Sequence, residues 1–195
     1  DGRLNWEGQP DQDPDPQEFG LGDDIKVGTF VDRGDENNKN TIQYQRYVKI
    51  AAARGNRYSL DTQAKLDSFA IDLGNGARMT PYASAGRIRG ASDKVPKVDT
   101  ENEQSVSMLV TYGKFDFLVS GDMIGRRAGA EDAQVERAVG AKIAAAGRVV
   151  DVLHVNHHGA NNASDDVFLR QIKPTIAVMV APAVAPTGTV RLISP

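Results

Sequence analysis

The chain contains no cysteine, and this absence removes several kinds of functional site at once. Disulfide frameworks, cysteine-ligated zinc fingers, iron–sulfur clusters and thiol nucleophiles all require the missing thiol group. A chain without thiols is compatible with either side of a membrane, so the redox compartment stays open. The absence of cysteine therefore excludes several kinds of site but no cellular compartment.

The sequence also lacks a surplus of positive charge and a long apolar run. Its 23 basic and 26 acidic residues give a net charge of -3 over 195 residues. An overall electrostatic attraction to nucleic acid is therefore excluded, and any polyanion has to be held locally. The longest apolar stretch, residues 176–185, has about half of the roughly 20 residues of a spanning helix and contains Pro182. The sequence predicts no membrane span.

What is present divides the chain into two parts. Residues 1–24 carry eight acids, one base and three prolines. That composition buries too little apolar surface to offset the entropy of ordering, so we expect an acidic, proline-rich arm or surface loop. From residue 25 to 195, short strand patterns alternate with helical ones, which predicts a layered α/β domain.

Hairpin signals dominate the first half of this domain. The sequence Gly74-Asn75-Gly76 between two alternating segments is typical of a hairpin turn. Apolar residues spaced i, i+3, i+4 and i+7 after Thr41 predict a helix. We expect a strand at residues 26–31, a helix at 41–55, the two hairpin strands at 68–73 and 77–83, and a loop at 87–104.

Strands and helices alternate in the second half. An apolar stripe predicts a helix that ends at Gly147, and Ser164 is expected to cap a helix that Pro174 ends. The expected strands are residues 105–112, 114–119, 149–155, 176–180 and 189–193. The strand at residues 176–180 is expected to be buried in the domain.

All three histidines of the chain lie within five positions. His154 falls inside an expected strand, where a packed, hydrogen-bonded core histidine is favoured over a ligand. His157 and His158 follow the strand end, and Gly159 lets the backbone pass close to a ligand. Neutral imidazole is the commonest transition-metal ligand, so this pair predicts either a metal site or an ordinary surface pair.

Asp122 is the second candidate, because it directly follows an apolar strand and a glycine. Sites of α/β sheets commonly lie at the carboxyl ends of strands, although an acid there can also cap a turn. If the two strands are parallel neighbours, Asp122 and the histidine pair meet at one edge of the sheet. Arg126 and Arg127 then offer local positive charge, or simply a solvated approach to the next helix.

These motifs resemble the second half of a metallo-β-lactamase-fold hydrolase, and more narrowly the hydrolase domain of ComEC-type competence proteins. The similarity covers roughly residues 26–180. The motifs that carry it are an Asn-rich segment before a strand, Gly-Asp after the next strand, and His-His-Gly after a later strand. The earlier Val31-Asp32-Arg33-Gly34 and Tyr44-x-x-Tyr47 are also similar. The resemblance implies an αβ/βα sandwich, incomplete in this chain, with residues 25–195 as its C-terminal portion.

The resemblance also implies a dinuclear site that binds a divalent metal, zinc being favoured. Asp122 matches the bridging aspartate, and His157 matches a ligand of the second metal, with His158 as the alternative because the doublet leaves the register open. The family's His-x-His-x-Asp-His motif is absent, and Ala160 replaces a serine. The chain therefore offers at most Asp122, His157 and His158 as metal ligands.

The missing ligands leave several functions open. We expect a hydrolase of phosphodiesters or nucleic acid whose N-terminal half is supplied by another chain or another stretch of the same protein. The start at Asp1, without a methionine or an apolar leader, fits a processed product or part of a longer one. The alternatives are an inactive binding or assembly module with the same fold, and an extracellular interaction domain. The similar proteins lie outside the cytoplasmic membrane, which favours an extracytoplasmic location.

Overall fold

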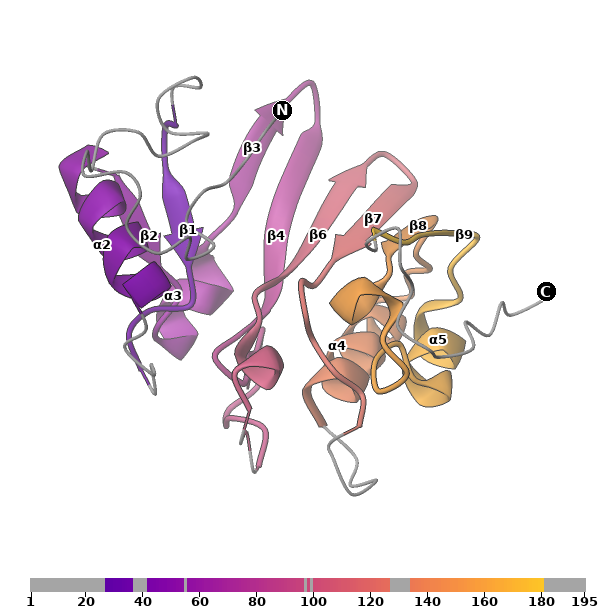
Figure 1. The fold of residues 1–195 in the computed structure, drawn as a ribbon. Helices are drawn as coiled ribbons and strands as arrows, with labels where there is room; N and C mark the ends of the chain where they lie inside the picture. The colour runs from indigo at the N-terminus through magenta and orange to yellow at the C-terminus, as the bar shows by residue number, and fades with distance from the viewer. Residues whose placement is uncertain are drawn as a thin grey trace. The chain divides into compact units, whose positions relative to one another are not determined.

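The computed structural model describes residues 27–36, 42–54, 56–96, 98, 100–126 and 134–180 (Figure 1). The fold is mixed α/β, as the sequence predicts. The chain divides into two compact units, Asp1–Ser59 and Leu60–Pro195, with a boundary inside the segment expected to form one domain. The expected acidic arm at residues 1–24 and the expected strand at 189–193 lie outside the described residues.

In the first unit, one helix connects two short parallel strands. Strands β1 (Phe30–Asp32) and β2 (Arg57–Ser59) pair in parallel, and α2 (Ile42–Arg54) lies between them in sequence. The predicted helix is confirmed, although Thr41 and Gly55 lie outside the described residues. The strand begins later than residue 26, because pairing starts where the Phe30 N–H donates to the Asn56 carbonyl at 2.7 Å.

A charge cluster holds the ends of this unit together. Arg57 Nε lies 2.6 Å from Asp32 Oδ2, and the Tyr47 hydroxyl donates to the same oxygen at 2.7 Å. Burial by itself raises the pKa of Asp32, but the hydrogen bonds from Arg57, Tyr47 and neighbouring donors outweigh it and lower the pKa below its usual value. The Asp-Arg-Gly turn is thus fixed by a cation from the second strand.

The second unit is built on one mixed sheet. Its strand order is β3-β4-β6-β7-β8-β9, with β5 paired to β4 (Figure 1). Pairing is antiparallel from β3 to β7 and parallel from β7 to β9. The strands are β3 (Ile71–Gly74), β4 (Ala77–Ser84), β5 (Arg87–Ile88), β6 (Ser107–Tyr112), β7 (Phe115–Val119), β8 (Val152–His154) and β9 (Ile176–Val178).

The hairpin is confirmed, but two neighbouring predictions need correction. Strand β3 starts at Ile71 rather than at Ser68, because Ser68 ends the helix α3 (Gln63–Ser68). The segment 87–104 is not only a loop: it contains β5 and the 3₁₀ turn η1 (Asn102–Gln104). Arg89 anchors this segment by donating to the Leu66 and Asp67 carbonyls at 2.6 and 2.5 Å.

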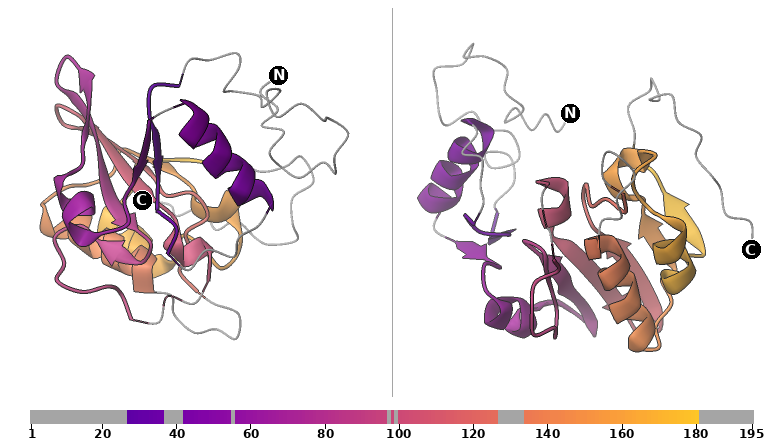
Figure 2. Two further views of the ribbon diagram at one scale, coloured as in Figure 1. Left: turned by 90° about the vertical axis from the view of Figure 1, so that its left-hand side faces the viewer. Right: turned by 90° about the horizontal axis from the view of Figure 1, so that it is seen from below.

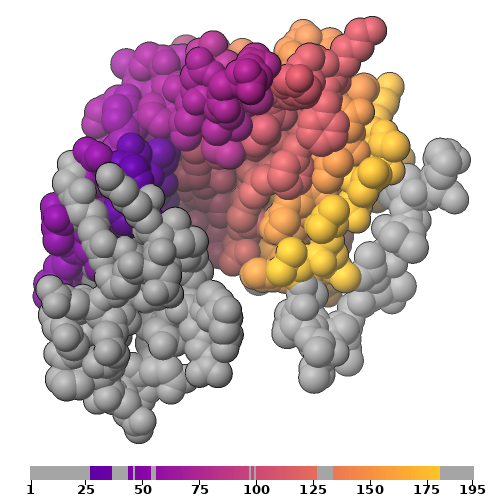
Figure 3. Space-filling view, turned by 90° about the horizontal axis from the view of Figure 1, so that it is seen from above, coloured from indigo at the N-terminus to yellow at the C-terminus, as the bar shows by residue number. Residues whose placement is uncertain are grey.

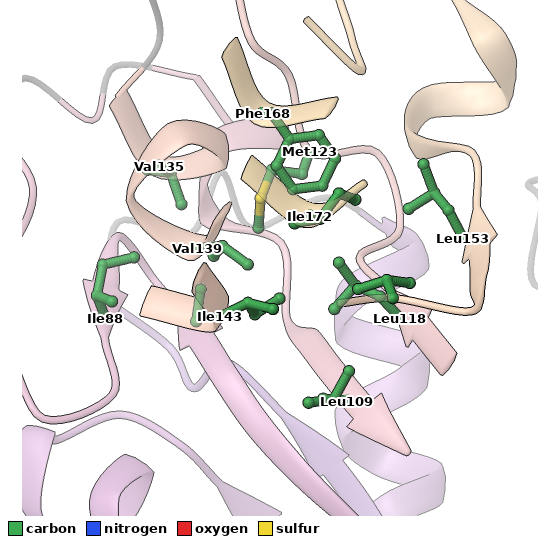
Figure 4. Close-up of a cluster of buried hydrophobic side chains, with 12 residues drawn as sticks. Ile88, Leu109, Leu118, Met123, Val135, Val139, Ile143, Leu153, Phe168 and Ile172 are labelled. Atoms are coloured by element: carbon green, nitrogen blue, oxygen red, sulfur yellow. The ribbon is translucent and has the colours of Figure 1, made fainter. Parts of the chain in front are cut away.

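Two helices cover one face of the sheet and close the core. Helices α4 (Gln134–Ala145) and α5 (Asp166–Ile172) lie side by side (Figure 1 and Figure 2). Their apolar residues meet those of the strands in one cluster (Figure 4). The cluster is Ala83, Ile88, Leu109, Leu118, Met123, Val135, Val139, Ile143, Val150, Leu153, Phe168 and Ile172. No helix in the described part of the chain is long and apolar enough to cross a membrane.

The cap of α5 differs from the prediction. Asp165, not Ser164, is the N-cap, because its carboxylate accepts from the Phe168 N–H at 2.9 Å. Ser164 instead has a positive φ of 51°, and its hydroxyl accepts from the Asn156 N–H at 3.3 Å. Sequence preference permits either residue as a cap, and the path of the preceding loop selects the aspartate.

The opposite face of the sheet is apolar. The pairing register places side chains of β4, β6, β7, β8 and β9 in two rows on this face. The rows are Met79, Val110, Phe117, Val152 and Ile176, and Pro81, Met108, Val119, His154 and Val178. Strand β9 was expected to be buried, but Ile176 is 54% exposed and the yellow atoms of this strand lie at the surface (Figure 3). It is exposed because it is the edge strand and pairs only with β8.

Candidate functional site

The two candidate motifs lie at the ends of neighbouring parallel strands. Leu118 of β7 pairs with Leu153 of β8, so both strands run toward the same edge. Asp122 follows β7, and the histidine loop, residues 156–165, follows β8. The His157 N–H donates to the Gly121 carbonyl at 2.9 Å and joins the two loops directly. The predicted convergence of the strand ends is confirmed.

His158 is the histidine that meets Asp122. Its Nε2 atom lies 3.3 Å from Asp122 Oδ1, and the two side chains are 55% and 47% exposed. The other ring nitrogen, Nδ1, lies 2.9 Å from the Val180 carbonyl. A carbonyl oxygen only accepts, so Nδ1 carries a proton. When His158 is neutral, its Nε2 lone pair therefore faces a carboxylate oxygen, an arrangement that a cation stabilises.

The spacing of this pair is that of a direct ion pair and also that of two ligands of one divalent metal ion. Zinc lies about 2.0–2.1 Å from imidazole nitrogen and carboxylate oxygen, so two such ligands at a tetrahedral angle stand about 3.3 Å apart. The Asp122–His158 separation of 3.3 Å matches that spacing. Histidine ligands of metals also commonly donate their second ring N–H to a backbone carbonyl, as His158 does to Val180.

His157 is oriented differently. Its Nδ1 lies 3.2 Å from Asn162 Oδ1, and its Nε2 lies 3.4 Å from Asn102 Nδ2. A neutral imidazole that donates from Nδ1 and accepts at Nε2 satisfies both contacts. Both ring nitrogens of His157 are therefore engaged by asparagine amides, which hold the ring between η1 and the histidine loop.

The three residues predicted as ligands do not form one cluster. Among the described residues, no group of three or more histidine and acidic side chains is arranged to hold a metal ion. The structure brings Asp122 to His158, and it turns His157 toward Asn102 and Asn162. Arg126 is exposed at the same edge, and Arg127 lies outside the described residues. Of the three predicted ligands, Asp122 and His158 are the two that lie in contact.

His154 was predicted to be a packed, hydrogen-bonded core histidine, and the described residues do not show the predicted hydrogen bond. The residue lies on the apolar second face of the sheet, level with Val119 and Val178. Its Nδ1 atom is buried and has no hydrogen-bond partner among the described residues. The neighbouring strand positions are apolar, so the sheet offers this nitrogen no acceptor or donor.

The histidine loop has a strained backbone. His157 and His158 have φ angles of 49° and 54°, in the left-handed region that disfavours side chains other than glycine. Each such residue costs on the order of 1–2 kcal/mol, so other contacts must hold the loop in place. Gly159 continues the turn at φ 77°, and a Cβ atom there would collide with Met179. The loop therefore passes against the end of β9.

Glu136 of α4 holds this loop by accepting hydrogen bonds from both of its ends. Its Oε1 atom accepts from Asn156 Nδ2 and from the Ser164 N–H, both at 2.7 Å. Its Oε2 atom accepts from the Asp165 N–H at 3.0 Å. The side chain is fully buried, and burial raises the pKa of Glu136 to about 7, against the lowering effect of the three donors.

The sequence interpretation missed Glu136, Asn102 and Asn162 as individual residues of this site. One signal was available for Glu136: with Val139, Gly140 and Ile143 it follows the i, i+3, i+4, i+7 spacing of a buried helix face. A carboxylate at a core position needs hydrogen-bond partners and therefore marks a polar contact. Asn102 belongs to the Asn-rich segment that carries the resemblance, but no local pattern places either asparagine at His157, because only the folded loops bring them there.

No protein-family model and no curated protein matches this chain.

Proposed function

We propose that this chain carries part of a divalent-metal hydrolase site of the metallo-β-lactamase type, with Asp122 and His158 as its ligands. The observation that supports it best is the 3.3 Å approach of Asp122 Oδ1 to His158 Nε2. The carbonyl of Val180 fixes the His158 tautomer that leaves Nε2 free to bind a cation. Of the two histidines considered from sequence, the contacts favour His158.

The reaction class follows from the ions such a site takes. A divalent metal, with zinc favoured, supplies an activated water and positive charge that stabilises the oxygens of a phosphodiester. On this chain Asp122 and His158 hold and orient the ion, and the exposed Arg126 adds positive charge at the same edge. This local positive charge would attract a phosphodiester or nucleic-acid substrate even though the net charge of the chain is -3.

The proposal includes a second half-domain that supplies the remaining ligands. A catalytic zinc uses three protein ligands, and two meet on the described part of this chain. The apolar second face of the sheet, with Val110, Phe117 and Val152 in one row, suits the packing of another sheet. We propose that the missing half of the αβ/βα sandwich packs there, from another chain or another stretch of the same protein.

Zinc titration of the chain, followed by NMR, tests the ligand assignment. Zn²⁺ should shift the resonances of Asp122 and His158, and Asp122→Asn and His158→Gln should each abolish the shift. His157→Gln is the matched control, because it changes the adjacent imidazole, whose nitrogens contact asparagines. Shifts that depend on His157 and not on His158 would contradict the assignment.

The metal content of the purified chain tests whether the site is partial. Two ligands hold zinc weakly, so we expect little metal by mass spectrometry in the chain alone and stoichiometric metal with its complementary half. Tightly bound, stoichiometric zinc in the chain alone would overturn the partial site. No metal in either form favours the alternative function, an inactive binding or assembly module, which the two-ligand cluster also fits.

A further inference from the structure

We propose that Glu136 is a positioning residue for the Asp122–His158 pair. It holds the histidine loop in the geometry that brings His158 Nε2 to Asp122 Oδ1. The inference rests on the proposed function, because it assigns Glu136 to the same metal site. Glu136 itself lies on α4, beneath the loops, and contacts neither of the two proposed ligands in the described hydrogen bonds.

The first support is that Glu136 binds the histidine loop at both of its ends. Asn156 immediately precedes the histidine pair, and Ser164 and Asp165 close the loop at the start of α5. The three hydrogen bonds, at 2.7, 2.7 and 3.0 Å, converge on one carboxylate. The two ends of the loop are therefore tied to one point on a rigid helix, with the strained His157–His158 turn between them.

The second support is that Glu136 also packs against the Asp122 loop. A Cβ atom added to Gly125 would collide with Glu136 Oε2, so the backbone three residues after Asp122 lies directly against the carboxylate. The N–H groups of Gly125 and Arg126 both donate to the Asn162 carbonyl at 2.9 Å. Glu136 thus lies where the two ligand-bearing loops meet, and its displacement moves both.

The third support is the match between the donors and a carboxylate. Glu136 receives three N–H groups, and an ionised carboxylate offers acceptor sites on both oxygens. A glutamine has one acceptor oxygen and turns an NH₂ group toward the Asp165 N–H. An alanine has no acceptor for any of the three. The series Glu, Gln, Ala therefore removes the anchoring in steps.

The test measures Zn²⁺ binding at pH 8 by NMR shifts of the His158 ring in the 195-residue chain. We expect Glu136→Gln to weaken Zn²⁺ affinity about tenfold and Glu136→Ala to weaken it further, as loss of an outer-shell partner does. The control is Asp116→Asn, which alters another buried carboxylate of the same unit, paired with Arg148. It should lower Tm but leave the affinity within about twofold.

The outcomes separate this inference from the proposed function. Unchanged affinity in both Glu136 variants, or equal weakening in Asp116→Asn, would overturn the positioning role. If the parent chain shows no Zn²⁺ shift at Asp122 or His158, the proposed function fails, and amide exchange in metal-free protein decides the inference. Faster exchange at residues 157–164 in Glu136→Gln than in Asp116→Asn supports the positioning role, and equal rates overturn it.

Discussion

Asp116 and Glu136, two of the buried carboxylates of the second unit, have opposite surroundings. Asp116 of β7 is paired with Arg148, whose Nε and Nη2 atoms lie 2.9 and 2.5 Å from its two oxygens. Glu136 of α4 receives only uncharged donors from the described residues: one side-chain amide and two backbone N–H groups. Both residues are inside the protein, but only Asp116 has a cation beside it.

This difference separates a structural carboxylate from one that serves a loop. The Asp116 hydrogen bond raises the pKa of Arg148, so the positive charge of that pair persists across the ordinary pH range. Burial raises the pKa of Glu136 to about 7, so its charge changes near neutrality. The Asp32–Arg57 pair of the first unit has the same design as Asp116–Arg148. Glu136, by contrast, accepts hydrogen bonds only from uncharged groups among the described residues.

The largest expected effect is loss of the cation beside Asp116. Arg148→Ala leaves a buried carboxylate without its partner, and it should lower the free energy of unfolding by about 3 kcal/mol. Urea unfolding measures this change. Arg170→Ala is the control, because its pair with Asp166 is exposed and should contribute less than about 0.5 kcal/mol. Equal losses in the two variants would contradict the contrast between buried and exposed pairs.

The next effect concerns the pH dependence of stability. Glu136 has a pKa of about 7 in the folded chain and 4.5 as its ordinary value, so folding favours its protonated form. Its contribution to stability is fully present below pH 4.5 and is lost as pH rises to about 7, by about 3 kcal/mol at most. Unfolding free energies from pH 4.5 to 8 should fall in the parent chain and stay flatter in Glu136→Gln. The same slope in both would refute the assignment.

A smaller effect is expected at His154. Its buried Nδ1 has no partner among the described residues, and its strand neighbours on that face are apolar. His154→Leu keeps the volume and removes the unpaired nitrogen, so it should raise stability by up to about 1 kcal/mol. His154→Ala, which also removes packing, should instead lower Tm. A loss of stability in the leucine variant would show that the nitrogen has a partner.

The smallest effect on stability is expected at Asp122. Its side chain is 47% exposed, so Asp122→Asn should change the free energy of unfolding by less than about 0.5 kcal/mol. In the hydrolase that we propose, assembled with its complementary half, Asp122→Ala or Asp122→Asn should however abolish phosphodiester hydrolysis. A colorimetric phosphodiester substrate and a thermal melt of the same samples separate the two effects. Retained hydrolysis would remove Asp122 from the site.

Local patterns predicted much of this fold. The Gly74-Asn75-Gly76 turn, the strands β6 and β7, and the helices α2, α4 and α5 follow from turn residues and apolar spacing. Short elements such as β2, α3 and β5 were missed, because their few residues carry too little periodicity. Strand β9 was expected to be buried, since an apolar segment does not reveal that it lies at the edge of the sheet.

The sequence alone determined that Asp122 and the histidine pair follow strands, because glycine and apolar runs mark those strand ends locally. Only the tertiary structure decided which histidine meets the acid. That choice depends on the left-handed turn at His157 and His158, on the Val180 carbonyl, and on Glu136 from another helix. Such contacts join residues far apart in the chain, so no spacing within the sequence records them.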